Sequence, residues 1–203
     1  MKIRKEFSAL LLILSLVLAL LPLTANRSFS LKPEKLLSEV LKDDVAFTVD
    51  QVAEFIVRED NTVQLIDLRS PEEFRKQAIP GAVNIPYPEF IRKDPETWLG
   101  NKKIMNIFYA TGNREADYAL VYARGLGYEN SFVMEGGITE WITTVMETKF
   151  EGERITAREN ALFETRRRAG EMFTELNNLP DSLKTKFLES RKFNAKKLDG
   201  GCE

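Results

Sequence analysis

The sequence contains no histidine, and among its 203 residues it has a single cysteine, Cys202. Without histidine, the chain cannot form a Ser-His-Asp or Cys-His catalytic group, a histidine-liganded metal site or an imidazole acid-base pair. One cysteine excludes an intramolecular disulfide framework and a cysteine-based zinc site. We therefore expect neither a metal nor a cofactor.

The charge balance also lacks an excess of either sign. Twenty-nine Lys and Arg residues stand against 31 Asp and Glu residues, which gives a formal net charge of −2. A nucleic-acid-binding protein would carry a concentrated basic surface, so we expect no nucleic acid partner. The hydrophobic fraction of 43% is sufficient for the core of one domain with appendages.

The N-terminal segment has the layout of a secretory signal peptide, predicted at residues 1–25. An uncharged apolar stretch runs from residue 7 to residue 23. It is followed at position 25 by Ala25, a small residue suited to cleavage. It follows a basic start made of Lys2, Arg4 and Lys5. A signal anchor is the alternative, although the stretch falls short of the roughly 20 residues that span a bilayer. Pro22 favours cleavage, which predicts an exported protein, periplasmic or secreted, without stable membrane insertion.

Short apolar runs alternate with amphipathic segments between residues 46 and 147. This alternation predicts an α/β fold with a mostly parallel sheet. We expect strands at 63–68, 83–85, 104–108 and 131–134, and a surface excursion at 86–102. Helix starts are predicted where Thr48 precedes Gln51 and where Ser70 precedes Glu73, because both pairs have capping-box spacing.

The regions outside this segment are expected to be helical or irregular. We predict an N-terminal helical lead-in at 26–45, a C-terminal helical extension at 148–193 and a flexible tail at 194–203. Within the extension, apolar residues at heptad spacing predict a long amphipathic helix over 155–176, followed by a helix from Ser182 to about Phe193. The long helix either packs across its own domain, which we favour, or binds a partner.

One loop has the position and composition of an anion-binding site. It joins a predicted buried strand to a predicted helix, where backbone N–H groups and the helix N-terminus attract negative charge. The carboxyl ends of parallel strands are the usual location of ligand sites in α/β folds. The predicted ligand-binding loop consists of Tyr109, Ala110, Thr111, Gly112, Asn113 and Arg114.

Here the chain resembles the rhodanese-like domain family, over about residues 46–147. Four segments match the family's pattern in order: 67–74, 79–86, 109–114 and 135–141. The resemblance implies about five mainly parallel strands with helices on both faces. It also suggests that Asp67 and Arg69 form a structural ion pair at a strand end, and it gives them no catalytic role.

Two positions depart from the family's sulfurtransferases. Their loop reads Cys-x-x-Gly-x-Arg; Gly112 and Arg114 match this pattern, but Tyr109 occupies the cysteine position. A phenol with a pKa near 10 is weakly ionised at neutral pH and cannot carry a persulfide sulfur. Gln77-Ala78 replaces a Gly-His pair of the family. We therefore predict no persulfide chemistry in this loop. We favour a Tyr109 ring that fills the emptied pocket, and a catalytic phenol at Tyr109 is the alternative.

These observations leave two functional hypotheses. The first is an exported, catalytically inactive rhodanese-like module that binds a small anion or a partner protein at residues 109–114. The alternative is a periplasmic sulfur carrier or thiol-exchange partner that uses Cys202, whose neighbours Gly200 and Gly201 would let the thiol reach another protein. A dimer linked through Cys202, or assembled through the long helix, is a third possibility.

Overall fold

The computed structural model describes residues 7, 11, 15, 29–40, 43–149 and 156–188. Its centre is a five-stranded sheet with the strand order β1-β5-β4-β2-β3, in which all neighbouring strands are parallel. The predicted α/β fold with a mostly parallel sheet is confirmed. The strands are β1 (Ala46–Phe47), β2 (Val63–Asp67), β3 (Val83–Asn84), β4 (Met105–Tyr109) and β5 (Ser131–Met134).

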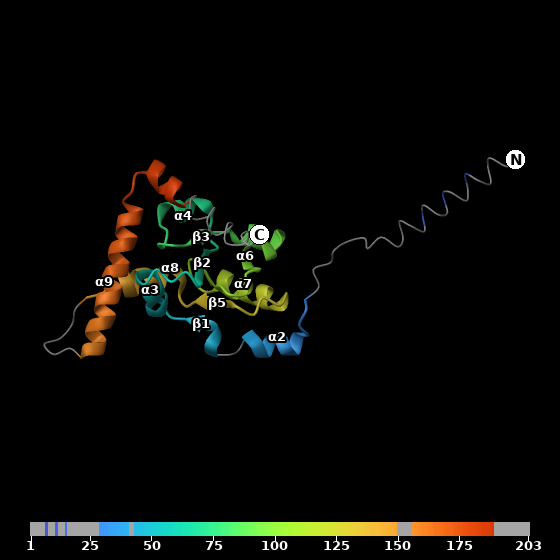
Figure 1. Cartoon of the computed structure of the whole chain (residues 1–203), viewed down its shortest axis with the longest axis horizontal. Helices are drawn as coiled ribbons and strands as arrows, with labels where there is room; N and C mark the ends of the chain where they lie inside the picture. Colours follow the sequence, from blue (N-terminus) through green and yellow to red (C-terminus); the bar gives the residue numbers. More distant parts are fainter. Residues whose placement is uncertain are drawn as a thin grey trace, which may run out of the picture.

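Helices cover both faces of this sheet (Figure 1). Side chains alternate along each strand, so Ile107 and Tyr109 of β4 point to one face while Phe108 points to the other. We call the face with Ile107 and Tyr109 the α9 face. It packs against α3 (Val49–Val57), α4 (Pro71–Lys76), α8 (Gly137–Trp141), the π-helical turn η2 (Ile142–Met146) and α9 (Ala157–Asn177). The opposite α7 face packs against α5 (Tyr87–Arg92), α6 (Glu96–Leu99) and α7 (Arg114–Gly125).

Both predicted capping boxes are present. At α3, the Thr48 side chain accepts a hydrogen bond from the Gln51 N–H, and the Gln51 side chain accepts one from the Thr48 N–H. Ser70 and Glu73 form the same reciprocal pair at α4. Each cap satisfies backbone donors that the first helical turn leaves free, which stabilises the helix by about 1 kcal/mol. The loops that precede both helices are thereby fixed.

One prediction for the surroundings of the sheet was wrong, and one strand was not predicted. Residues 86–102 are more than a surface excursion, because they contain α5 and α6 and bury Phe90 and Leu99 in the core of the α7 face. The prolines that suggested an irregular segment stand at helix starts, where a missing N–H costs nothing. The sequence analysis also missed β1, which is only two residues long.

The N-terminal lead-in docks on α7. It contains α2 (Pro33–Val40) and the turn η1 (Asp43–Val45). Just before α2, the Ser30 N–H and hydroxyl both donate to the Gly125 carbonyl at the end of α7, at 2.7 and 3.2 Å. The Phe29 ring lies edge-on to Tyr122. These contacts attach the lead-in to the same helix that starts at the predicted ligand-binding loop.

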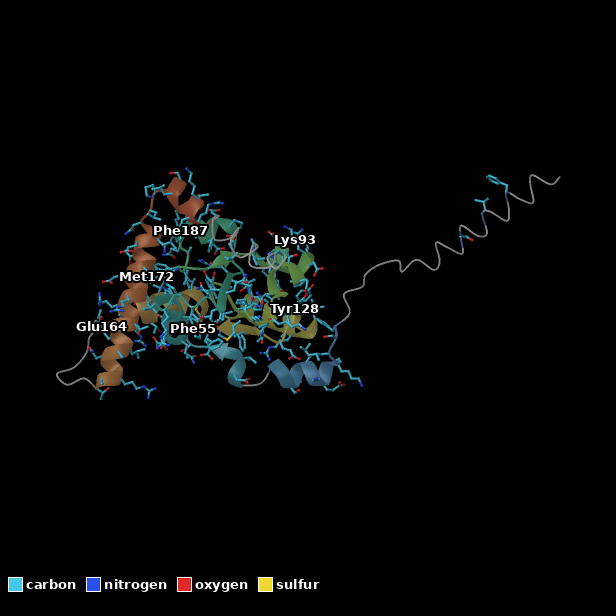
Figure 2. All side chains as sticks on the ribbon, in the orientation of Figure 1. Phe55, Lys93, Tyr128, Glu164, Met172 and Phe187 are labelled. Carbon is cyan, nitrogen blue, oxygen red and sulfur yellow. The ribbon has the colours of Figure 1, made fainter. Side chains whose placement is uncertain are left out.

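The C-terminal extension packs across its own domain, as predicted. Helix α9 lies against α3 and η2 along one side of the molecule (Figure 1). In Figure 2, Met172 on α9 and Phe55 on α3 mark the two helices that pack together. Arg166 of α9 forms a two-pronged ion pair with Asp50 of α3, with N–O distances of 2.6 and 2.7 Å. A further helix over 181–188 follows, and its predicted continuation to Phe193 lies outside the described residues.

Several predictions fall on parts of the chain that are not described. The signal peptide at 1–25 is among them, apart from Phe7, Leu11 and Ser15, and so is the tail at 194–203 with Cys202. Among the described residues, no helix combines the length and hydropathy needed to cross a membrane.

Candidate functional site

Strands β2 and β4 end side by side at the carboxyl edge of the sheet. Asp67, the last residue of β2, pairs in register with Tyr109, the last residue of β4. Both side chains point to the α9 face, because Leu65 and Ile107 two residues earlier belong to the core of that face. The edge of the sheet therefore places an acid and a phenol next to each other.

Asp67 and Arg69 form a buried ion pair at this edge. The Asp67 carboxylate is fully buried and accepts from the Arg69 guanidinium at 2.5 and 3.0 Å, and from the Arg69 backbone N–H at 2.9 Å. Arg69 also donates to the Gln77 carbonyl at 2.6 Å. Burial alone would lower the pKa of Arg69, but the hydrogen bonds and charge of Asp67 raise it. Arg69 thus stays charged, and its hydrogen bonds to Asp67 and Gln77 fix the chain after β2.

Tyr109 is enclosed beside this pair. Its exposed fraction is 0%, and the Arg69 guanidinium carbon lies 5.8 Å from the centre of its ring. The hydroxyl lies close to Asp67, Arg69 and the Ile79 backbone, but it forms no hydrogen bond of good geometry. Burial, reinforced by the negative charge of Asp67, raises the pKa of Tyr109 well above 10 although Arg69 opposes this. Tyr109 is therefore a neutral side chain of the core.

Helix α8 holds the loop after Tyr109 by donating hydrogen bonds to the loop's carbonyl oxygens. The carbonyl of Ala110 accepts from the Ile138 N–H at 2.9 Å, and the carbonyl of Thr111 accepts from the Thr139 hydroxyl at 2.8 Å. Gly137 makes this close approach feasible. It has φ +60°, and a Cβ atom there would lie 2.4 Å from the Ala110 carbonyl oxygen. The loop conformation is therefore determined by the Gly136-Gly137 turn.

The N-terminus of α7 is left without a side-chain cap. Asn113 stands at the cap position, but its side chain accepts from the Gly136 N–H at 2.6 Å and makes no capping bond to α7. The first N–H groups of a helix have no intrahelical partner, and they carry a partial positive charge. Thr111 and Asn113 are exposed, so this positive end faces solvent.

The structure separates the six residues of the predicted ligand-binding loop. Tyr109 belongs to β4 and is buried, whereas Ala110 to Asn113 form the loop itself. Arg114 is the first residue of α7, and 75% of its side chain is exposed. It pairs with Glu115 at 3.2 Å and does not fold over the loop.

Sequence reasoning missed several residues that shape this site. Asn84 of β3 donates to the backbone carbonyls of Asp67 and Arg69, at 3.0 and 2.9 Å. Thr139 holds the loop, and Asn177 and Lys184 of the extension reach the segment that follows α4. An asparagine in a strand or at a helix end has no spacing that reveals its distant partner, so no local signal could have identified these contacts.

No metal centre is evident in the part of the chain that the structure describes. There, no group of three or more acidic or cysteine side chains converges in a way that could hold an ion. At the end of β2, the Asp67 carboxylate is already paired with the Arg69 guanidinium.

A search of protein families matches residues 48–144 to the Rhodanese-like domain. Residues 48–144 form a rhodanese-like domain. The parallel five-stranded sheet with helices on both faces agrees with this assignment. The match includes the candidate site, from Asp67 at the end of β2 to the Gly136-Gly137 turn.

Curated relatives of the rhodanese-like domain include enzymes of two kinds. The thiosulfate:glutathione sulfurtransferase of Saccharomyces cerevisiae is 26% identical over 108 residues, which cover 48% of this chain and 78% of the yeast protein. The tRNA uridine(34) hydroxylase of Bartonella quintana is 32% identical over 93 residues, which cover 43% of this chain but only 30% of that protein. The domain is thus related to sulfurtransferases and to tRNA hydroxylases.

Among solved structures, the single-domain sulfurtransferase RDL2 of Saccharomyces cerevisiae is 28% identical, with a TM-score of 0.42. The alignment covers 51% of this chain and 92% of the yeast chain.

Proposed function

We propose that this rhodanese-like domain has no sulfurtransferase activity at its own loop and that it binds a small anion there, free or carried by a partner protein. The burial of Tyr109 is the observation that carries the proposal. Tyr109 stands at the end of β4, and none of its surface is exposed. The sequence resemblance aligns this position with the catalytic cysteine of the family's sulfurtransferases. A group without access to solvent or substrate cannot act as a nucleophile.

The chemistry of Tyr109 supports the absence of transfer. Because its pKa is raised well above 10, the hydroxyl stays protonated at neutral pH, and a neutral phenol is a poor nucleophile. The loop itself contains no cysteine that could accept sulfur, since the single cysteine of the sequence is residue 202.

The exposed part of the loop supports anion binding. The uncapped N-terminus of α7 offers backbone N–H donors and partial positive charge, in a loop whose shape is fixed by α8. Arg114 adds a full positive charge at the first position of the same helix. The ion pair of Arg114 with Glu115 is exposed, so an incoming oxyanion competes with Glu115 in water at little cost.

Titration calorimetry with thiosulfate, sulfite and phosphate tests this proposal. We expect the wild-type chain to bind at least one of these oxyanions, and Arg114→Gln to weaken that binding about 10-fold, the effect of one charge-assisted hydrogen bond. Arg58→Gln is the matched control, because Arg58 is also an exposed arginine paired with a glutamate. Absence of binding to all three anions, or equal effects of the two substitutions, would contradict the proposal.

We also propose that the chain is exported by its N-terminal segment. The basic start, the apolar stretch and the small residue Ala25 support this. Mass spectrometry of the exported protein should give an N-terminus at Asn26. Ala25→Phe should block cleavage, whereas Ala19→Phe within the apolar stretch should not. Full-length protein that stays in the membrane fraction would favour the signal anchor instead.

A further inference from the structure

The segment that follows α4 is held by side chains from three parts of the chain. Three consecutive backbone carbonyls, at residues 76, 77 and 78, each accept a hydrogen bond from a side-chain donor. The carbonyls at the end of a helix have no intrahelical partners, and cations near them are favourable. The three donors are Lys184, Arg69 and Asn177.

Asn177, the last residue of α9, forms two hydrogen bonds with the backbone of this segment through its side-chain amide. Its side-chain oxygen accepts from the Ala78 N–H at 2.9 Å, and its side-chain nitrogen donates to the Ala78 carbonyl at 3.0 Å. The same nitrogen also donates to the Phe173 carbonyl within α9, at 2.8 Å. The amide group is therefore fully used, and its orientation is fixed.

Lys184 reinforces this contact from the helix at 181–188. Its exposed fraction is 3%, and its ammonium group donates to the Lys76 carbonyl at 3.0 Å and to the Asn177 side-chain oxygen at 2.6 Å. Burial lowers its pKa, against the opposing charge of Asp181. Within the described residues, Lys184 has no ion pair. Burying a lysine costs free energy unless its ammonium group is hydrogen-bonded, so the bonds to the Lys76 carbonyl and the Asn177 side chain are needed to hold Lys184 in this position.

The segment held in this way is part of the cover over Tyr109. Ala78 and Ile79 are fully buried, and they belong to the same hydrophobic cluster as Tyr109. Phe173 and Leu176 of α9 complete that cluster from the extension, together with Leu188 of the following helix. Figure 2 shows Phe187 of this helix beside α4, at the end of α9. Arg69 holds the segment from inside, and the extension holds it from outside.

We propose that residues 156–188 form an intramolecular strap that keeps the segment at 76–79 closed over position 109. Opening the strap at Asn177 and Lys184 exposes position 109, so the strap regulates access to this end of β4. This regulation is separate from anion binding at the exposed loop. The hydrogen bonds of Asn177 and Lys184 lie at one edge of the apolar packing between α9 and the domain, so a local opening at this edge leaves the sheet folded.

The accessibility of a thiol at position 109 tests the strap. The full chain with Tyr109→Cys and Cys202→Ala has one thiol. The rate at which this thiol reacts with Ellman's reagent reports how often position 109 becomes accessible. We expect Lys184→Met, which keeps an unbranched apolar side chain but removes the ammonium group and its hydrogen bonds, to accelerate this reaction about 10-fold or more. Lys186→Met is the matched control, because Lys186 is exposed on the same helix, and it should leave the rate unchanged.

A second pair of variants shows whether faster labelling comes from loss of the strap's hydrogen bonds and not from misfolding of one variant. Asn177→Ser should accelerate labelling as Lys184→Met does, whereas Asn178→Ser, at the exposed neighbouring position, should not. Circular dichroism should be unchanged in every variant used.

Equal labelling rates in Lys184→Met and Lys186→Met would overturn the strap, as would a thiol at position 109 that reacts as fast as free cysteine when the strap is intact. These results leave the anion titrations of the wild-type loop unaffected, so a failure of the strap and a failure of the proposed function are distinguishable.

Discussion

At the scale of single residues, the site depends on three side chains that share a buried corner at the ends of β2 and β4. Asp67 and Arg69 neutralise each other, and Tyr109 lies against them with a hydroxyl that has no hydrogen-bond partner of good geometry. The sequence resemblance indicated the ion pair and the unusual tyrosine. The sequence predicted that the ring fills the pocket but not which residues enclose it, because the enclosure depends on Ala78, Ile79 and helix α9, which begins at Ala157.

Tyr109 should make stability depend on alkaline pH. Its pKa is near 10 in the unfolded chain and well above 10 in the folded protein, so above pH 10 the unfolded chain loses a proton that the native state keeps. The free energy of unfolding should therefore fall by up to about 1.4 kcal/mol per pH unit through this group. Urea titrations of wild type and Tyr109→Phe between pH 8 and 11 should diverge above pH 10, with the phenylalanine variant losing less stability. Parallel curves would contradict the burial of the hydroxyl.

Asp67→Ala should destabilise the protein strongly. The substitution leaves the Arg69 guanidinium buried without its counter-ion, which costs about 3–5 kcal/mol. Glu54→Ala is the control: Glu54 forms an equally short ion pair with Arg58, but on the surface, and its loss should cost less than about 1 kcal/mol. Chemical denaturation measures both, and comparable losses would show that the Asp67–Arg69 pair has no special structural weight.

At the scale of helices and strands, local signals were predictable and distant packing was not. The capping boxes before α3 and α4 act within four residues, so their spacing was sufficient. The short strand β1 has no such signal and exists because it pairs with β5. In α9, heptad spacing predicted the helix but not its contacts: Ala169 and Leu176 are buried, whereas Leu162 is 37% exposed.

Two glycines should respond oppositely to alanine. Gly170 lies within α9, where an added Cβ would meet Met146 at 3.6 Å, an ordinary contact, so Gly170→Ala should stabilise the protein by about 0.5–1 kcal/mol. Gly137→Ala should destabilise it by more than that, because φ is +60° and the new Cβ would clash with the Ala110 carbonyl. Thermal unfolding should show one melting temperature raised and the other lowered. A neutral Gly137→Ala would mean that the loop is not held by this turn.

At the scale of the whole molecule, the rhodanese-like domain and its extension share one core. Phe173 and Leu176 of α9 lie in the same cluster as Leu65 of β2 and Trp141 of α8. The fold class was predictable because strands and helices alternate along the chain. That the extension packs on its own domain could only be favoured from the sequence, because an amphipathic helix packs equally well against its own domain or against a partner.

The most direct test of the account is a thiosulfate:cyanide sulfurtransfer assay on the full chain and on Cys202→Ala. We predict thiocyanate formation at the uncatalysed rate for both proteins, because Tyr109 offers no nucleophile. Turnover that disappears in Cys202→Ala would instead identify Cys202 as the sulfur carrier of the alternative hypothesis. Robust turnover that persists in Cys202→Ala would contradict the central claim.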